Sequence, residues 1–138
     1  MNSGEVVRRW IAAINEHDVK KLAAFYQEDA ATQDIPLGEP RRGREKIVSN
    51  LGALLSAYPD FHIEITNMVE GGDSVAIELL TSGTNLKPLR DTPPTGKAMS
   101  IREGMFIRLK EGKISRMTSY WDRREMTGDT SPSTAKRG

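Results

Sequence analysis

The apolar residues of this 138-residue chain change their spacing near residue 60. From Phe61 onward they alternate with polar residues, as in Phe61, Ile63 and Ile65, which is the pattern of a strand with one buried face. Earlier in the chain they recur at steps of three and four residues, the pattern of an amphipathic helix. The first helical stripe consists of Val6, Val7, Trp10, Ile11 and Ile14. Helices that precede a run of strands favour an α+β fold over alternating βαβ units.

Three helices are expected in the first half of the chain. They cover residues 5–16, a short segment that begins after the capping residue Asp18, and residues 43–57. The second helix is expected to carry Tyr26 on its apolar face, and a short strand over residues 30–35 should follow it. The third helix should end before Pro59, because the residue that precedes a proline is displaced from helical backbone angles.

The second half is expected to form a series of strands. They start at Phe61 and continue over residues 74–84, 98–110 and 113–122. Glycine-containing segments at 71–73 and 111–112 predict tight hairpin turns. Residues 85–97 are rich in proline and charge, which predicts a long loop. Residues 123–138 contain few apolar side chains and predict a flexible tail, so the folded domain is expected to span residues 1–122.

The composition argues against several kinds of protein. Twenty Lys and Arg residues nearly balance nineteen Asp and Glu residues, and the formal net charge of +1 gives no sign of a nucleic-acid-binding surface. No apolar run approaches the length of a membrane span, and the N-terminus lacks the apolar region of a signal peptide. We therefore expect a cytoplasmic protein without nucleic-acid or membrane partners. The chain has no cysteine, which excludes disulfides and a cysteine nucleophile.

Several segments of the sequence resemble one known family in the same order. The stretch INEHDVKKLAAFYQEDAATQDIPLGEPRRGREKI resembles the opening of a SnoaL-like polyketide cyclase or a ketosteroid isomerase. The second half of the SnoaL-like proteins resembles AYPDFHIEI, VEGGDSVAIELLTSGT, PPTGK and EGKISRMTSYWD. The resemblance implies the nuclear transport factor 2-like fold, a cone in which three N-terminal helices and a curved antiparallel sheet enclose an apolar pocket. It also implies a homodimer through the outer face of the sheet, where Tyr120 should point. The fold alone does not identify a reaction.

Glu103 is the least expected residue of its strand. The apolar side chains of Ile101, Met105 and Ile107 share one face, and Glu103 falls in register with them. Burial of a carboxylate is unfavourable unless it is paired or protonated, and either outcome shifts its pKa. Two interpretations are open: a catalytic carboxyl inside the pocket, or a rim residue that pairs with an arginine or a partner subunit.

Asp34 is the second candidate for catalysis. It lies in ATQDIPLG, where the resemblance to ketosteroid isomerase places that enzyme's general base. Removal of a proton next to a carbonyl requires such a carboxylate within hydrogen-bond reach of the substrate. The alternative is a turn residue, because Asp is common before a turn such as Pro-Leu-Gly. A role inside the pocket is the favoured interpretation.

Other positions depart from both enzymes. The resemblance places Trp10 where the isomerase has its oxyanion tyrosine, and an indole can donate only its N–H. It places Ser119 where the cyclase has its catalytic Asp, and Met105 where the cyclase has a histidine. Neither catalytic set is complete. The residues expected to line the pocket and contact the substrate are Trp10, Tyr26, Met105, Met117, Ser119 and Trp121.

These observations lead to a prediction of function. We expect an enzyme without a cofactor that uses Asp34 and Glu103 for proton transfer on a small hydrophobic, polycyclic or polyketide-like metabolite. The reaction would be a cyclisation, an isomerisation or the opening of an epoxide. The alternative is a non-catalytic small-molecule-binding or accessory domain of the same fold, which the loss of the cyclase Asp and His favours. No cluster of histidines and carboxylates has metal-ligand spacing, so no metal site is expected.

Overall fold

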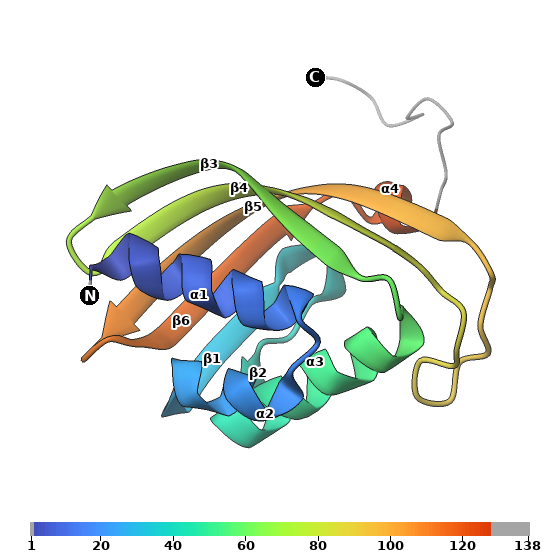
Figure 1. The fold of residues 1–138 in the computed structure, drawn as a ribbon, viewed down its shortest axis with the longest axis horizontal. Coiled ribbons are helices and arrows are strands. Elements are labelled where there is room, and N and C mark those ends of the chain that lie inside the picture. Colours follow the sequence, from blue (N-terminus) through green and yellow to red (C-terminus); the bar gives the residue numbers. More distant parts are fainter. Residues whose placement is uncertain (1, 128–138) are drawn as a thin grey trace.

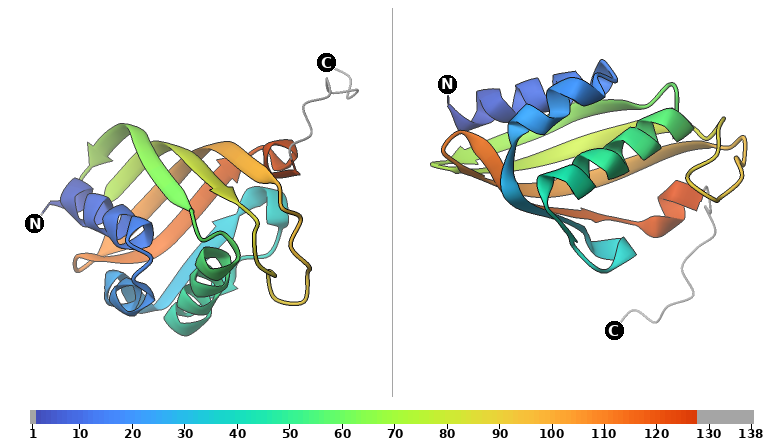
Figure 2. Two further views of the ribbon diagram at one scale, coloured as in Figure 1. Left: turned by 45° about the vertical axis from the view of Figure 1, so that its right-hand side comes forward. Right: turned by 90° about the horizontal axis from the view of Figure 1, so that it is seen from below.

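The computed structural model describes residues 2–127 as one curved, unclosed six-stranded sheet with helices packed on one side (Figures 1 and 2). In chain order the elements are α1 (Ser3–Asn15), α2 (Val19–Leu22), η1 (Ala23–Phe25), β1 (Tyr26–Asp34), η2 (Ile35–Leu37), β2 (Arg41–Arg42), α3 (Arg44–Ala57), β3 (His62–Gly71), β4 (Ser74–Thr84), β5 (Ala98–Lys110), β6 (Lys113–Trp121) and α4 (Arg123–Thr127). The predicted α+β cone with N-terminal helices is confirmed.

The sheet is mixed rather than wholly antiparallel as predicted. Its strand order is β2-β1-β6-β5-β4-β3, and β1 runs parallel to β6 while every other neighbouring pair is antiparallel. The strands β3, β4, β5 and β6 follow one another in the sequence, and each connection reverses the direction of the chain, so neighbouring strands are antiparallel. No such connection joins β1 to β6, because α3 and four other strands lie between them in the sequence. The parallel pair brings the C-terminal ends of β1 and β6 to the same edge of the sheet.

The first helix covers the sheet at the end formed by β3 and β4. The Asn2 side chain caps α1 by accepting a 2.9 Å hydrogen bond from the backbone N–H of Glu5. The predicted apolar stripe is buried, with Trp10 and Ile14 each only 1 % exposed. At the other end of α1, the Asn15 side chain bonds both the N–H and the C=O of Ile63 in β3. These two hydrogen bonds fix the C-terminal end of α1 against β3.

The second helix is shorter than predicted. Asp18 does cap it, but α2 ends at Leu22, and after one 3₁₀ turn Tyr26 begins β1 instead of continuing a helix. Tyr26 pairs with Ile114 of β6 and packs its ring edge-on against Trp10, with 6.3 Å between ring centroids. The strand pairing and ring contact available to Tyr26 are long-range, and the local spacing of apolar residues does not reveal them.

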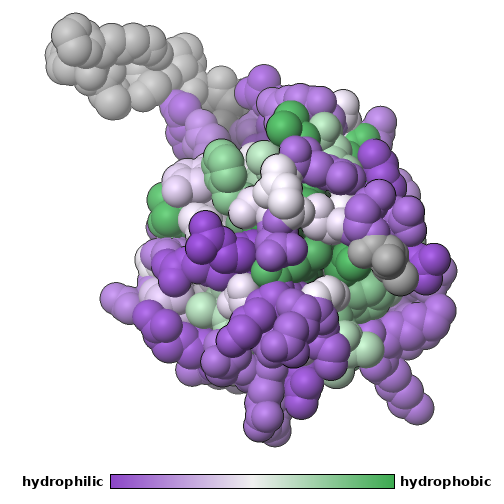
Figure 3. Space-filling view, turned by 90° about the vertical axis from the view of Figure 1, so that its left-hand side faces the viewer, coloured by the Kyte–Doolittle hydropathy of each residue, from purple (hydrophilic) through white to green (hydrophobic). Residues whose placement is uncertain are grey.

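Two tight hairpins form where the sequence predicted them. The β3–β4 turn contains Gly72, and the β5–β6 turn consists of Glu111 and Gly112. Both residues of the second turn have positive φ, 53° for Glu111 and 75° for Gly112, as a two-residue type I′ turn requires. Most of this end of the molecule is covered by hydrophilic side chains, with apolar side chains showing only between them (Figure 3).

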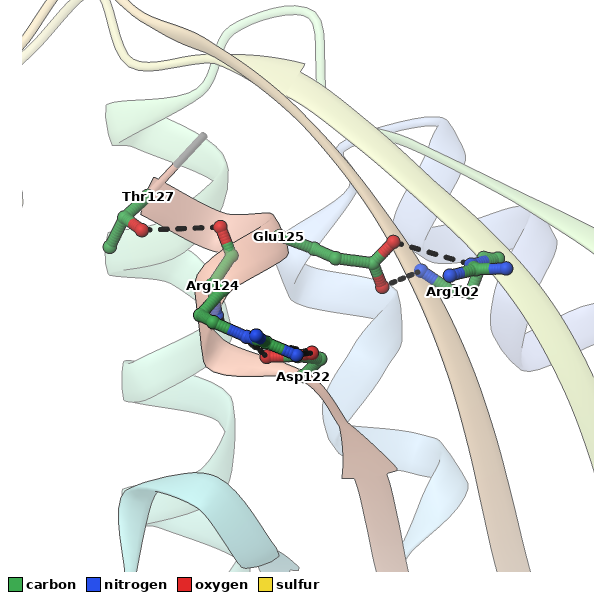
Figure 4. Close-up of polar contacts among 5 residues, drawn as sticks. All are labelled: Arg102, Asp122, Arg124, Glu125 and Thr127. Atoms are coloured by element: carbon green, nitrogen blue, oxygen red, sulfur yellow. Dashed lines mark hydrogen bonds and ion pairs between the residues drawn. The ribbon is translucent and has the colours of Figure 1, made fainter. Parts of the chain in front are cut away.

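The segment predicted as a flexible tail from residue 123 begins instead with a short helix, α4. Glu125 of this helix accepts hydrogen bonds from the backbone N–H and the guanidinium of Arg102 in β5, both at 3.2 Å (Figure 4). The Arg124 guanidinium pairs with Asp122 at 2.7 Å. The rest of the predicted tail, residues 128–138, lies outside the described residues. Within residues 2–127, no helix has the length and apolar character needed to cross a membrane.

Candidate functional site

Two adjoining chambers form a pocket between the helices and the concave face of the sheet. The outer chamber has a volume of about 180 Å³ and the inner chamber about 90 Å³. The outer chamber is bordered by Leu89 and Arg90 from the predicted long loop over 85–97 and by Met126 of α4, so this loop lies at the pocket mouth. Residues that line both chambers are Asp34, Arg41, Asn50, Leu54, Phe61 and Glu103. Pockets for drug-sized ligands usually measure about 300–1,000 Å³, so a larger ligand would extend through the mouth.

Glu103 faces this pocket from the middle of β5. Its neighbours Ile101, Met105 and Ile107 on the same face are buried, as the alternation in the sequence predicted. The hydroxyl of Ser119 donates a 2.7 Å hydrogen bond to Glu103 Oε2. Within residues 2–127 Glu103 forms no salt bridge with an arginine. The other form of the rim interpretation, a contact with a partner subunit, stays a prediction.

The surroundings of Glu103 favour its protonated form. Burial raises the pKa of Glu103 above its ordinary value. The hydroxyls of Ser119 and Thr81 oppose this rise, and the charge of nearby Asp34 adds to it. The Thr81 contribution is the weaker, because Thr81 Oγ1 lies beside the carboxyl without the geometry of a hydrogen bond. A carboxyl in this environment is suited to donating a proton.

Asp34 ends β1 and lies opposite Ser119 in the parallel pair with β6. Its Oδ2 accepts a 2.9 Å bond from the Arg41 guanidinium, and its Oδ1 accepts a 3.0 Å bond from the indole N–H of Trp121. The side chains of Asp34 and Arg41 are only 19 % and 21 % exposed. Each carboxylate oxygen still has a lone pair free, because each accepts one bond from the protein. Asp34 is therefore an ion-paired carboxylate that can accept a further hydrogen bond inside the pocket.

Trp10 and Tyr26 both line the inner chamber, and each is 1 % exposed. The indole N–H of Trp10 donates a 2.8 Å hydrogen bond to the Tyr26 hydroxyl. Burial raises the pKa of Tyr26, which keeps the hydroxyl protonated at neutral pH. The indole N–H of Trp10 is thus already bonded to Tyr26. The hydroxyl of Tyr26 is the group of this pair that can still form a hydrogen bond with a ligand in the inner chamber.

The other predicted pocket residues divide into two groups. Met105 and Met117 line the inner chamber, and Trp121 lines the outer one. Ser119 is fully buried and reaches the pocket only through its bond to Glu103. All eight predicted residues therefore lie in or directly behind one pocket, and their roles in binding or catalysis stay predictions.

Several pocket residues were not identified from the sequence. Arg41 lies in the charged stretch EPRRGREK, where no local pattern shows which side chain turns inward. Arg90 projects from the mouth loop and donates a 2.6 Å hydrogen bond to Asn50 Oδ1 in α3. Thr32, on β1, is 2 % exposed and borders the inner chamber. Thr32 lies between Ala31 and Gln33, and this local sequence gives no signal that would separate a pocket residue from an ordinary core residue.

The mouth loop is held in place by Asn85, which is 6 % exposed. Its amide N–H₂ donates to the carbonyl oxygen of Lys87 at 2.9 Å, and its Oδ1 accepts from the backbone N–H of Thr95 at 2.9 Å. A longer bond of 3.4 Å reaches the carbonyl of Ala57 at the end of α3. One side chain thus ties both ends of the loop together and to the helix behind it. In the part of the chain that the structure describes, no three His, Asp or Glu side chains converge as metal ligands would.

A family model for SnoaL-like polyketide cyclases matches residues 4–128. The chain belongs to this family. The matched range includes every residue that lines the pocket, Met126 of α4 among them.

Solved structures agree with the assignment to the SnoaL-like family. SalBIII, described as an epoxide hydrolase/cyclase-like enzyme in pyran ring formation in the polyether salinomycin, is 26% identical over 89% of this chain and 92% of that chain, with a TM-score of 0.75. IdmH from Streptomyces antibioticus, a proposed polyketide cyclase, is 21% identical over 94% of this chain and 98% of that chain, with a TM-score of 0.78. A proposed SnoaL-like polyketide cyclase from Jannaschia sp. CCS1 is 16% identical over 94% and 93%, with a TM-score of 0.81. The last two likenesses concern the fold alone.

Proposed function

We propose that this SnoaL-like protein is an acid–base enzyme in which Glu103 donates a proton and Asp34 accepts one. The observation that carries the proposal is the presence of two carboxyl groups with different surroundings in one apolar pocket. Glu103 has a raised pKa through burial, whereas Asp34 is ion-paired with Arg41. Two titratable groups whose environments differ in this way are typical of acid and base roles. The binding-domain alternative loses support, because neither carboxyl is turned away from the cavity.

The reaction class that fits best is closure of a ring by addition of a hydroxyl group to an epoxide. The hydroxyl oxygen attacks one epoxide carbon and its proton passes to Asp34. The bond from that carbon to the epoxide oxygen breaks, and Glu103 gives its proton to this oxygen. The product is an isomer of the substrate, so the step consumes no cofactor, and proton exchange with water resets the two carboxyls. The likeness to SalBIII supports this class over steroid isomerisation.

The experiment uses a panel of aryl-substituted 4,5-epoxy alcohols as probes and measures their conversion to cyclic ethers by chiral chromatography. We expect Glu103→Gln and Asp34→Asn each to lower the rate about 10²–10⁴-fold, the usual contribution of general acid–base catalysis. The matched controls are Glu64→Gln on β3 and Asp29→Asn on β1, because both residues are exposed. Wild-type rates in both pocket variants would refute the roles of the two carboxyls. Binding of the probes without conversion by the wild type would favour the non-catalytic alternative.

A further inference from the structure

The inner chamber contains two hydroxyl groups whose hydrogen-bonding capacity the protein does not use fully. Thr32 is 2 % exposed, and its Oγ1 has no hydrogen-bond partner among the described residues. Tyr26 is 1 % exposed, and its hydroxyl takes part in a single hydrogen bond within residues 2–127, the one from Trp10. Buried polar atoms in folded proteins are nearly always paired, so an unpaired one next to a cavity points to a missing partner.

The geometry of the Trp10–Tyr26 pair determines which way Tyr26 can bond. An indole N–H can only donate, so the Tyr26 hydroxyl must be the acceptor in their 2.8 Å bond. Its own proton is then available to another acceptor. The two rings are perpendicular and nearly fully buried, which holds the hydroxyl in one position. Both Tyr26 and Thr32 therefore present hydrogen-bond donors to the inner chamber.

The rest of the inner chamber is mostly apolar. Its apolar lining includes Ile14, Ile47, Leu51, Met105 and Met117. A cavity of 150 Å³ can hold a benzene ring, so the inner chamber, at about 90 Å³, has room for a smaller group. A few polar atoms in an apolar pocket usually fix the orientation of a ligand. The other unpaired buried hydroxyl, that of Thr81, lies beside Glu103 and belongs to the surroundings of that carboxyl.

We propose that the inner chamber is a subsite for an uncharged oxygen acceptor of the ligand, a ketone or cyclic ether oxygen, which accepts hydrogen bonds from Thr32 and Tyr26. This inference rests on the proposed function in taking the pocket as the substrate site. The substrate is then an apolar molecule that enters with an oxygen-bearing end. Its reacting atoms follow at Glu103 and Asp34, which line both chambers, and the remainder extends towards Leu89 and Arg90 at the mouth.

The test uses acetophenone and α-methylstyrene, two probes of the same shape in which C=O and C=CH₂ are exchanged. Their dissociation constants are measured by calorimetry or ligand-observed NMR for the wild type, Thr32→Val and Tyr26→Phe. We expect Thr32→Val to weaken acetophenone binding about 3–10-fold, the value of one hydrogen bond, and to leave α-methylstyrene binding within twofold. Thr118→Val is the matched control, because Thr118 lies outside both chambers on the same sheet.

Thr32→Val keeps the test decisive if Tyr26→Phe fails to fold, because valine has the shape of threonine and removes an unpaired hydroxyl. An unchanged ratio of the two dissociation constants in Thr32→Val would overturn the proposal, as would equal loss of both probes. Failure of the wild type to bind either probe at millimolar concentration would overturn it as well. These measurements do not depend on turnover. If Thr32→Val changes the ratio of the two dissociation constants but the wild type does not convert the epoxy alcohols, the subsite is supported and only the proposed reaction is rejected.

Discussion

The indole N–H of Trp121 donates a 3.0 Å hydrogen bond to Asp34 Oδ1, although the two residues are 87 positions apart in the sequence. Their proximity follows from the parallel pairing of β1 with β6, in which Asp34 lies opposite Ser119. Trp121 is two residues beyond Ser119 on the same face of β6. The C-terminal ends of these two parallel strands thus bring the Asp34 carboxylate next to the Trp121 indole. Ser119, also on β6, donates a hydrogen bond to Glu103 of β5.

Replacement of Trp121 by Phe tests this relationship. The variant keeps an aromatic ring at the pocket but leaves Asp34 with Arg41 as its remaining donor. We expect the free energy of unfolding to fall by about 1.5–3 kcal/mol, the value of a hydrogen bond to a charged group, as measured by urea denaturation. The rate with epoxy alcohol probes should fall as well, because Asp34 would lose one of the two contacts that orient it. Unchanged stability and unchanged rate would show that the bond does not hold Asp34 in solution.

The raised pKa of Glu103 predicts a pH-dependent difference in stability between the wild type and Glu103→Gln. Below the ordinary value of 4.5 the carboxyl is protonated in both the folded and the unfolded chain. As the pH rises, the unfolded chain ionises first, so the wild type loses stability until the folded pKa is passed. The loss is about 1.4 kcal/mol for each unit by which the pKa is raised. Glu103→Gln has no carboxyl to ionise at this position. Its free energy of unfolding should therefore rise relative to that of the wild type over this pH range.

Urea denaturation of both proteins between pH 4 and pH 8 measures this difference. Ser119→Ala is a useful companion variant, because the Ser119 hydroxyl opposes the rise in the Glu103 pKa. Its removal should extend the loss of stability to higher pH. A constant difference between the wild type and Glu103→Gln at every pH would contradict the raised pKa.

Much of this site could be predicted from the alternation of apolar and polar residues along the strands. The features that the sequence did not predict all depend on contacts between distant parts of the chain. The period of two along β5 and β6 placed Glu103, Met105 and Met117 on the pocket side correctly. The direction of β1 relative to β6 was wrong, because pairing between strands far apart in the sequence leaves no local pattern. Arg41 and Arg90 were missed for a related reason: charged residues in irregular segments are usually solvated, and only the tertiary structure shows which of them border the pocket.

Asn85 is predicted to control the shape of the pocket mouth. Asn85→Ala would leave the backbone N–H of Thr95 and the carbonyl of Lys87 without their buried partner. We expect a loss of about 1–3 kcal/mol in the free energy of unfolding. Acetophenone should bind more weakly, because Leu89 and Arg90 lie on the released loop. The control is Asn67→Ala, since Asn67 is exposed and its amide donates a hydrogen bond to Glu78 on the neighbouring strand. Equal effects of the two substitutions would contradict a special role for Asn85.

The outer face of the sheet is predicted to join two copies of the chain. Phe106 and Tyr120 are 62 % and 50 % exposed there, and their rings meet edge-on with 6.2 Å between centroids. Phe106 also borders a shallow groove of about 590 Å³ on this face. Exposed aromatic residues that cluster in this way are typical of protein interfaces.

We expect sedimentation of the wild type to give twice the mass of one chain, and the double variant Phe106→Lys with Tyr120→Lys to sediment as a monomer with its helices and strands intact. Two positive charges per chain on this face would each have to be buried in the dimer without a partner, which is strongly unfavourable. Leu86→Lys is the matched control, because Leu86 is a large apolar residue, 57 % exposed, in the loop that follows β4. A monomeric wild type, or a dimer that survives the double substitution, would show that this face does not join two chains.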